Sequence, residues 1–185
     1  MKKIWYSIIA GTALLECHTA QAVAIGDIYY SDKTFSAELV ASKTPIGLVY
    51  WVSPGGDFGL IMQLEQPANT MNYYGANLYC NEYKTEGTKA GDWWLPERIE
   101  LIRMGQENIN GVQTDKFNTL NTKLPTIKKD DVVLGQQLVS NQYYWSNSYY
   151  GYSFKLNSTN SFTYTGTDDS PTNTTKYYAR CVTAF

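Results

Sequence analysis

The chain has 185 residues, a formal net charge of −2 and 43% hydrophobic residues, which is enough for one domain with a substantial core. Beyond residue 22 it carries 13 basic and 16 acidic side chains. This balance gives no electrostatic support for a nucleic-acid partner or for binding to an anionic membrane surface.

The first 22 residues have the features of a secretory signal peptide. Lys2-Lys3 form a basic start, an apolar run follows over residues 4–15, and Ala20-Gln21-Ala22 is a small-residue cleavage site, with Ala22-Val23-Ala24 as a second candidate. The apolar run is shorter than the about 20 residues that span a membrane. Cys17 would suit a lipoprotein, but the three residues before it include no small one.

We therefore expect residues 1–22 to be removed and residues 23–185 to form one exported domain, located in the periplasm, at the cell surface or outside the cell, with no membrane insertion after cleavage. The single histidine, His18, lies in the leader. The mature chain then has no Ser-His or Cys-His nucleophile and no histidine-based zinc site.

Two hairpins are predicted at the start of the mature chain. Residues 25–39 form a strand, a turn at Ser31-Asp32-Lys33 and a polar return. Residues 45–52 are apolar and β-branched, and residues 58–64 are a second predicted strand. Between them lies Ser53-Pro54-Gly55-Gly56-Asp57, a cluster of turn-forming residues.

The stretch from Gly91 to Leu101 is predicted to connect a sheet to a helix. Trp93 and Trp94 are too large to stay in water, so at least one should anchor the core. Pro96 suits the first position of a helix, because its missing N–H would be unpaired there, and the helix is predicted to run to about Glu107. Glu100 is placed to meet the exposed amides at its start.

Two further helices are predicted from the spacing of apolar residues. Within residues 70–84, one helical face is formed by Ala76, Tyr79, Cys80 and Tyr83. The other helix places Phe117, Leu120 and Leu124 on one face and ends before Pro125. After a charged turn at residues 128–131, short strands with polar turns continue to Phe185. The pattern predicts a single α+β domain.

Cys80 and Cys181 are the two cysteines that remain after the leader. In an exported chain an even pair favours a disulfide, and the alternative is two buried free thiols. A bond between them would close a loop of about 100 residues and, in the chain-entropy model, stabilise the fold by roughly 4–5 kcal/mol.

Residues 140–185 have an unusual composition: 8 Tyr, 8 Thr, 7 Ser and 5 Asn, with only five charged side chains. Tyrosine offers a large, rigid contact surface, while serine and asparagine supply adaptable hydrogen bonds, as in antibody recognition loops. The alternative is a polar sheet whose aromatic side chains pair across strands for stability.

No residues form a recognisable catalytic or metal site. Asp130-Asp131 and Asp168-Asp169 are sequence neighbours in predicted loops, which indicates no facing pair of acids. Gln66-Pro67-Ala68 and Trp145-Ser146-Asn147 lack the oxygen ligands of calcium-dependent sugar sites. We therefore expect no enzyme activity, no cofactor and no metal.

Several motifs resemble one known family. The Gly-x-Trp-x-Leu-Pro-x-x-x-Glu-Leu pattern at residues 91–101 is similar to the signature of the DUF1566 family, the Legionella collagen-like protein C-terminal domain. Residues 25–32, Tyr144-Trp145-Ser146-Asn147-Ser148 and the closing run at residues 179–185 match in the same order. Glu97, where the family usually has Ser or Thr, and Lys33, where it has glycine, depart from the pattern.

The resemblance implies a C-type-lectin-like fold, with two or three helices packed on antiparallel hairpins and a Tyr-rich C-terminal sheet. Its relatives include formylglycine-generating enzymes and the variable proteins of diversity-generating retroelements. It also implies a disulfide from the first helix to the last strand. Trp93, Trp94, Trp145 and Phe185 would belong to the frame.

The combined prediction is an exported, non-enzymatic recognition or adhesion domain that binds an extracellular glycan or protein through its C-terminal segment. The residues predicted to make the contacts are Tyr149, Tyr150, Tyr152, Asn157, Asn160 and Tyr164. The alternatives are a retroelement-diversified variable protein and a structural component of a cell-envelope or fimbrial assembly.

Overall fold

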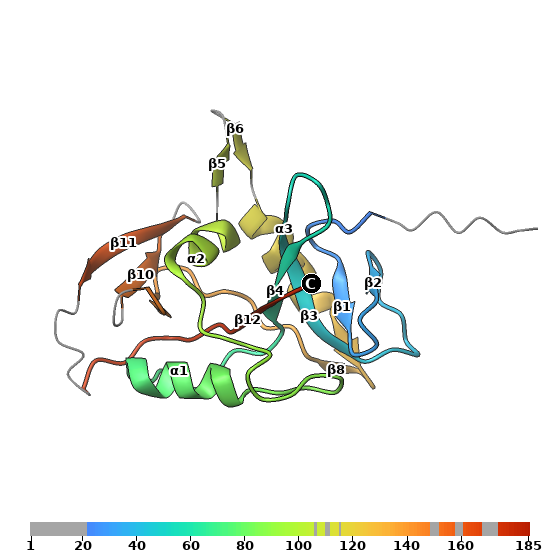
Figure 1. Ribbon diagram of the computed structural model, residues 1–185, viewed down its shortest axis with the longest axis horizontal. Helices are drawn as coiled ribbons and strands as arrows, with labels where there is room; N and C mark the ends of the chain where they lie inside the picture. Colours follow the sequence, from blue (N-terminus) through green and yellow to red (C-terminus); the bar gives the residue numbers. More distant parts are fainter. Residues whose placement is uncertain are drawn as a thin grey trace, which may run out of the picture.

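A computed structural model describes residues 22–105, 107–109, 112–114, 116–148, 152–157, 161–167 and 174–185. Its centre is a five-stranded antiparallel sheet with the strand order β12-β4-β3-β1-β2. The strands are β1 (Ile28–Tyr30), β2 (Phe35–Ser36), β3 (Pro45–Val52), β4 (Gly59–Gln63) and β12 (Val182–Ala184). The last strand, β12, therefore pairs with β4, although the two strands are far apart in the sequence (Figure 1).

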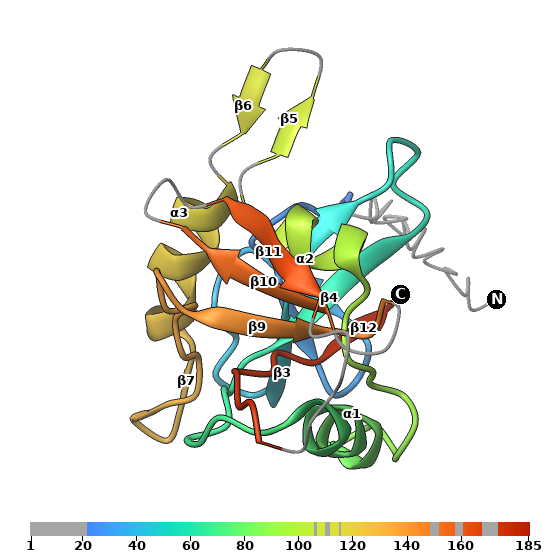
Figure 2. The ribbon, with the colours of Figure 1, turned by 90° about the vertical axis from the view of Figure 1, so that its left-hand side faces the viewer.

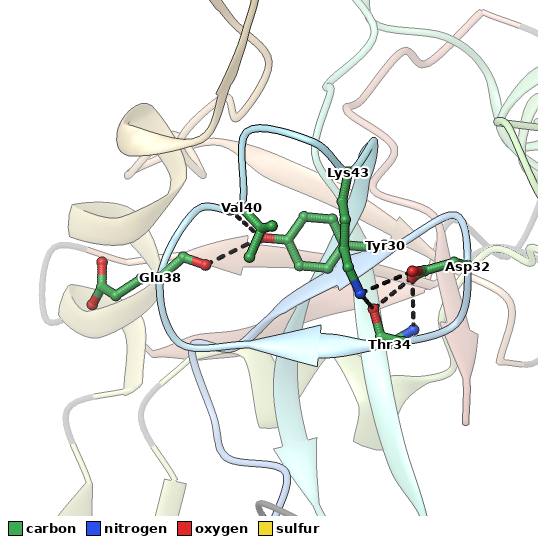
Figure 3. A network of polar contacts seen from close by, with 6 residues as sticks. All are labelled: Tyr30, Asp32, Thr34, Glu38, Val40 and Lys43. Carbon is green, nitrogen blue, oxygen red and sulfur yellow. Dashed lines mark hydrogen bonds and ion pairs between the residues drawn. The ribbon is translucent and has the colours of Figure 1, made fainter.

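Both predicted N-terminal hairpins are confirmed, as β1–β2 and β3–β4. In the first turn, Lys33 has a φ of +64°, a conformation that favours glycine, and it occupies the position where the resembling family has glycine. Figure 3 shows the polar contacts around this turn. Asp32 accepts hydrogen bonds from Thr34 and pairs with Lys43 at 2.9 Å, while the Tyr30 hydroxyl donates to the carbonyl of Glu38.

Three α-helices are present among the described residues: α1 (Tyr73–Glu82), α2 (Arg98–Met104) and α3 (Lys116–Lys123), the last followed by the 3-10 turn η1 (Leu124–Thr126). The first and third match their predicted positions. Asn72 caps α1 by accepting a hydrogen bond from the amide of Gly75 at 2.8 Å.

The predicted limits of the second helix are wrong at both ends. Pro96 precedes the helix, because its carbonyl accepts the Asn147 amide and the chain stays extended until Glu97. The helix stops at Met104 before Gly105 and does not reach Glu107. Instead, β5 (Glu107–Ile109) and β6 (Val112–Thr114) form a hairpin that projects from the body of the protein (Figures 1 and 2). The expected role of Glu100 is confirmed, since its carboxylate accepts the amide of Glu97 at 2.8 Å.

A second, three-stranded sheet has the order β11-β10-β9 and comprises β9 (Tyr143–Ser146), β10 (Tyr152–Leu156) and β11 (Phe162–Thr167). It is the predicted Tyr-rich C-terminal sheet. The charged turn is also confirmed, between β7 (Lys128–Lys129) and β8 (Val132–Val133). Asp130 and Asp131 both have positive φ angles there, of 48° and 64°.

The core has two parts, one on each face of the five-stranded sheet. Because side chains alternate along a strand, Ile28 and Tyr30 face α2, α3 and the small sheet, whereas Tyr29 faces the α1 side. Trp93 is fully buried on the α1 side and contacts Tyr83 edge to face, which confirms that an indole anchors the core. The structure is therefore a mixed α+β domain. No described helix has the length and apolar character needed to cross a membrane.

The predicted disulfide joins Cys80 of α1 to Cys181, the residue before β12, with the two Cα atoms 5.2 Å apart. It therefore clamps the helix to the central sheet. The Trp94 amide and carbonyl pair with Val182 at 2.9 Å, and Phe185 packs against Phe35. Trp94 therefore lies beside β12 and Phe185 directly follows it, so both expected frame residues contact the central sheet.

Arg180 is completely buried beside this disulfide, and it receives no carboxylate partner among the described residues. Its guanidinium donates hydrogen bonds to the backbone carbonyls of Gln63, Leu64, Glu65, Gln136 and Gln137 and to the side chain of Gln66. Burial lowers the pKa of Arg180, as desolvation disfavours its charge. The side chain ties the end of β4 to the segment before β9.

Candidate functional site

Three of the six predicted contact residues, Tyr152, Asn157 and Tyr164, are described, and they lie in the small sheet or directly after one of its strands. Tyr152 is the first residue of β10, opposite Ser146 and Thr167, and Tyr164 lies in β11 opposite Phe154. Tyr149, Tyr150 and Asn160 lie outside the described residues.

Asn157 is described and has a structural role in the β10–β11 turn. Its side-chain oxygen accepts a hydrogen bond from the backbone amide of Ser161 at 3.0 Å. The backbone amide of Asn157 donates to the Ser161 carbonyl, also at 3.0 Å. These bonds join the end of β10 to Ser161, the residue before β11, and Asn157 is half-buried.

The β9–β10 loop starts at a fixed point between α1 and α2. The Asn147 side-chain oxygen accepts hydrogen bonds from the Tyr73 hydroxyl at 2.9 Å and from the Asn77 amide group at 3.0 Å. The next residue, Ser148, accepts the backbone amide of Arg98 at 2.7 Å. Asn147 and Ser148, at the end of β9, are therefore anchored to α1 and to the start of α2, and Tyr149 and Tyr150 follow them in the sequence.

Beside this base, five aromatic rings contact one another in a row that starts on α1, reaches β9, continues to residue 177 and ends on β9. We call this set the aromatic ladder; in order of contact it is Tyr74, Tyr73, Trp145, Tyr177 and Tyr143. The successive ring centroids are 5.6, 5.9, 4.7 and 5.0 Å apart. The ammonium of Lys155 lies 5.8 Å from the Tyr143 ring at the far end.

The ladder passes from the interior to the surface. Trp145 is buried, and its indole nitrogen donates to the Met71 carbonyl at 2.6 Å, so the centre of the ladder belongs to the frame, as expected. Tyr74 at its α1 end is 59% exposed. The tyrosines of the ladder together with Asn77 and Asn147 form what we call the contact face, which presents phenol rings and amide groups to solvent.

This face could be predicted only in part. The sequence pointed to tyrosines and asparagines after residue 140, and Asn147 and Tyr143 belong to that segment. Tyr73, Tyr74 and Asn77 were missed because the helix was interpreted as scaffold. The available signal was the adjacent pair Tyr73-Tyr74 at a helix start, with Asn77 four residues later on the same side as Tyr73.

The described residues contain no group of three or more His, Cys, Asp or Glu side chains that could hold a metal ion. Asp130 and Asp131 lie in the β7–β8 turn, and Asp168-Asp169 lies outside the described residues. An open hollow of about 740 Å³ lies elsewhere, between residues 24–27 and α3, lined chiefly by Thr119, Thr122 and Lys123, and includes none of the predicted contact residues.

No family model matches this chain, and comparison with curated proteins gives no match. Among solved structures, the chain is similar to a fimbrial protein from Bacteroides ovatus, with a TM-score of 0.54 and 15% sequence identity. The match covers 86% of this chain and 48% of that protein, so the chain spans about half its length. At this identity the likeness shows a shared α+β fold.

Proposed function

We propose that the mature chain is an exported, non-enzymatic recognition domain that binds a glycan or a protein at the contact face and the adjoining β9–β10 loop. The observation that carries this proposal is the junction at Asn147. There the base of the tyrosine-containing loop is hydrogen-bonded to Tyr73 and Asn77, next to the exposed ring of Tyr74.

The chemistry of the face suits recognition. Phenol rings provide large contact areas and lose little side-chain entropy on binding, and amide groups both donate and accept hydrogen bonds. The frame beneath them is rigid, because Trp145 is buried and the disulfide holds α1 to β12. A preorganised face of this kind loses less entropy when a ligand binds.

The second candidate function is a structural part of a cell-envelope or fimbria-like assembly. The likeness in fold to a fimbrial protein favours it, as does the expected export of the chain. In such an assembly the contact face would be covered by a neighbouring subunit, or it would be displayed to a ligand at the surface of the fibre.

The test is binding of the mature, oxidised protein to glycan and protein arrays. Three variants are compared with the wild type: the Tyr149/Tyr150/Tyr152 triple alanine, the Tyr74→Ala/Asn77→Ala double variant, and Phe58→Ala. Phe58 is an exposed aromatic residue in the turn between β3 and β4. Figure 1 shows this turn on the opposite side of the molecule from α1.

The proposal predicts that the first two variants lose binding and that Phe58→Ala retains it. Equal binding by the wild type and both contact-face variants would exclude the face as the binding site. Absence of array binding, combined with incorporation of the chain into surface fibres, would favour the structural function.

A further inference from the structure

The described strands differ in how their outer edges are protected. A free strand edge exposes unpaired N–H and C=O groups that can pair with another chain, so folded proteins usually cover, shorten or charge their edges. At one end of the central sheet, Val182 of β12 is covered by two hydrogen bonds with Trp94, each 2.9 Å. At the other end, β2 has only two residues.

The same devices protect one edge of the small sheet and the two short hairpins. The outer edge of β9 is covered by Tyr178, which accepts the Trp145 amide and donates to the Tyr143 carbonyl, both at 2.9 Å. The strands β7 and β8 have two residues each and carry Lys128 and Lys129, and β5 and β6 have three.

Among the described residues, β11 is not shortened, charged or paired with a strand on its outer edge. It is six residues long, has the sequence Phe-Thr-Tyr-Thr-Gly-Thr, and includes no charged residue and no proline. On one side it pairs with β10; on the other side no described strand lies against it. Figures 1 and 2 both show it at the outside of the molecule, and Figure 2 shows β10 between it and β9.

The hydrogen bonds between β10 and β11 show which backbone groups of β11 face its outer edge. The amide of Leu156 donates to Gln142, toward β9, and the next amide, that of Asn157, donates to Ser161, toward the β11 side. Because backbone groups alternate in direction along an antiparallel strand, the N–H and C=O groups of Phe162 and Tyr164 point away from β10.

The edge is held firmly enough to act as a template. The Phe162 side chain is buried and contacts the Tyr144 ring edge to face, with centroids 5.5 Å apart. The Thr163 hydroxyl also donates to the carbonyl of Lys155 at 3.3 Å. The start of β11 is therefore fixed to the core, while no described strand pairs with its outer edge.

We infer that the outer edge of β11 pairs with the same edge of a second copy of this chain, in antiparallel orientation, to form a continuous six-stranded sheet across a two-fold axis. Self-pairing brings no like charges together, because the strand is uncharged. A two-fold contact also uses both open edges at once, whereas addition of a different strand would leave a new edge open.

This inference goes beyond the proposed function and does not depend on a ligand. In the dimer the two contact faces are displayed on one particle, which increases the avidity for a repeated ligand. Dimerisation and array binding are measured separately, so failure of this inference can be distinguished from failure of the proposed function.

The experiment is sedimentation equilibrium on the mature, disulfide-bonded chain over a wide concentration range. Tyr164→Pro removes an outward N–H without removing a hydrogen bond to β10, and Tyr164→Thr is the matched control that keeps the N–H and a β-favouring side chain. The wild type and Tyr164→Thr should reach twice the monomer mass, and Tyr164→Pro should remain monomeric.

Amide hydrogen exchange of the wild type gives a second test that needs no variant. Exchange at Phe162 and Tyr164 should slow as the concentration rises, while exchange at Trp94 should not change. A wild type that stays monomeric at every concentration, a dimer that persists in Tyr164→Pro, or exchange in β11 that is independent of concentration would each overturn the inference.

Discussion

Arg180 donates a hydrogen bond from Nη1 to the carbonyl oxygen of Leu64, at 3.0 Å, in the interior of the protein. Together with the other carbonyls around the same guanidinium, this bond connects the segment after β4 to the closing strand. A buried charge is costly unless its hydrogen-bonding groups are satisfied, so this residue acts as a polar clamp between distant segments.

We expect Arg180→Met to lower the free energy of unfolding by about 3–5 kcal/mol, because it leaves several buried carbonyl oxygens without a donor. The measurement is urea denaturation under oxidising conditions. Arg103→Met is the matched control. The Arg103 guanidinium lies 4.0 Å from the centroid of the Trp51 ring. Loss of this cation–π contact should lower the free energy of unfolding by only about 1 kcal/mol. Equal losses in the two variants would contradict the clamp.

Glu100 should make stability depend on pH. Burial, followed by repulsion from Glu97, raises its pKa above the usual 4.5, while bonds from the Glu97 amide and the Trp94 indole oppose the shift. A carboxyl with a raised pKa favours the folded state when protonated, and this contribution is lost as the pH rises through the raised pKa. Glu100→Gln should therefore gain stability relative to the wild type as the pH is raised from below 4.5 to neutral.

The check on Glu100 is urea denaturation of both proteins across that range. Glu86→Gln, at an exposed position whose carboxylate lies 3.9 Å from Lys129, is the control and should show no such gain. A constant stability difference between wild type and Glu100→Gln at all pH values would show that ionisation of Glu100 does not affect folding.

Asp32 should show the opposite dependence. Its hydrogen bond from the Thr34 hydroxyl, and then that from Lys43, lower its pKa from 3.8 to about 2 (Figure 3). A lowered carboxyl pKa contributes stability above the unfolded value of 3.8, and this contribution is lost as the pH falls through about 2. Asp32→Asn should therefore be less stable than the wild type at neutral pH, and the difference should shrink in acid.

NMR titration of the Asp32 carboxyl measures this pKa directly. Lys43→Met should raise the pKa only part of the way to its normal value, because the Thr34 hydroxyl remains; Thr34→Val should raise it further. The reverse order would show that the ion pair is the stronger influence.

Lys33→Gly should stabilise the protein by about 0.5–1 kcal/mol. A left-handed backbone costs a lysine roughly 1–2 kcal/mol, and the greater entropy of glycine in the unfolded chain offsets part of the gain. Thermal or urea denaturation measures the change. Ser31→Gly, in the same turn but without a positive φ, is the control and should lower the stability. Destabilisation by Lys33→Gly would mean that its side chain makes a compensating contact.

The amino-acid sequence by itself determined the local features of this protein. The turn residues between positions 53 and 57 predicted the β3–β4 hairpin, and the spacing from Ala76 to Tyr83 predicted α1. Cys80 and Cys181, the two cysteines outside the expected leader, predicted the disulfide. Each of these signals depends on residues close in the chain or, for the cysteines, on a pairing that has one solution once the expected leader is set aside.

The tertiary structure decided what depends on residues that are distant in the chain. The second helix begins late because Pro96 bonds to Asn147, and no local signal reveals that partner. The aromatic ladder forms only where Tyr73, Trp145 and Tyr177 meet in the fold. The outer edge of β11 is unpaired among the described strands because of how the strands are ordered in the small sheet. Packing and strand pairing are properties of the whole fold, so composition could point to the C-terminal tyrosines but not to their neighbours.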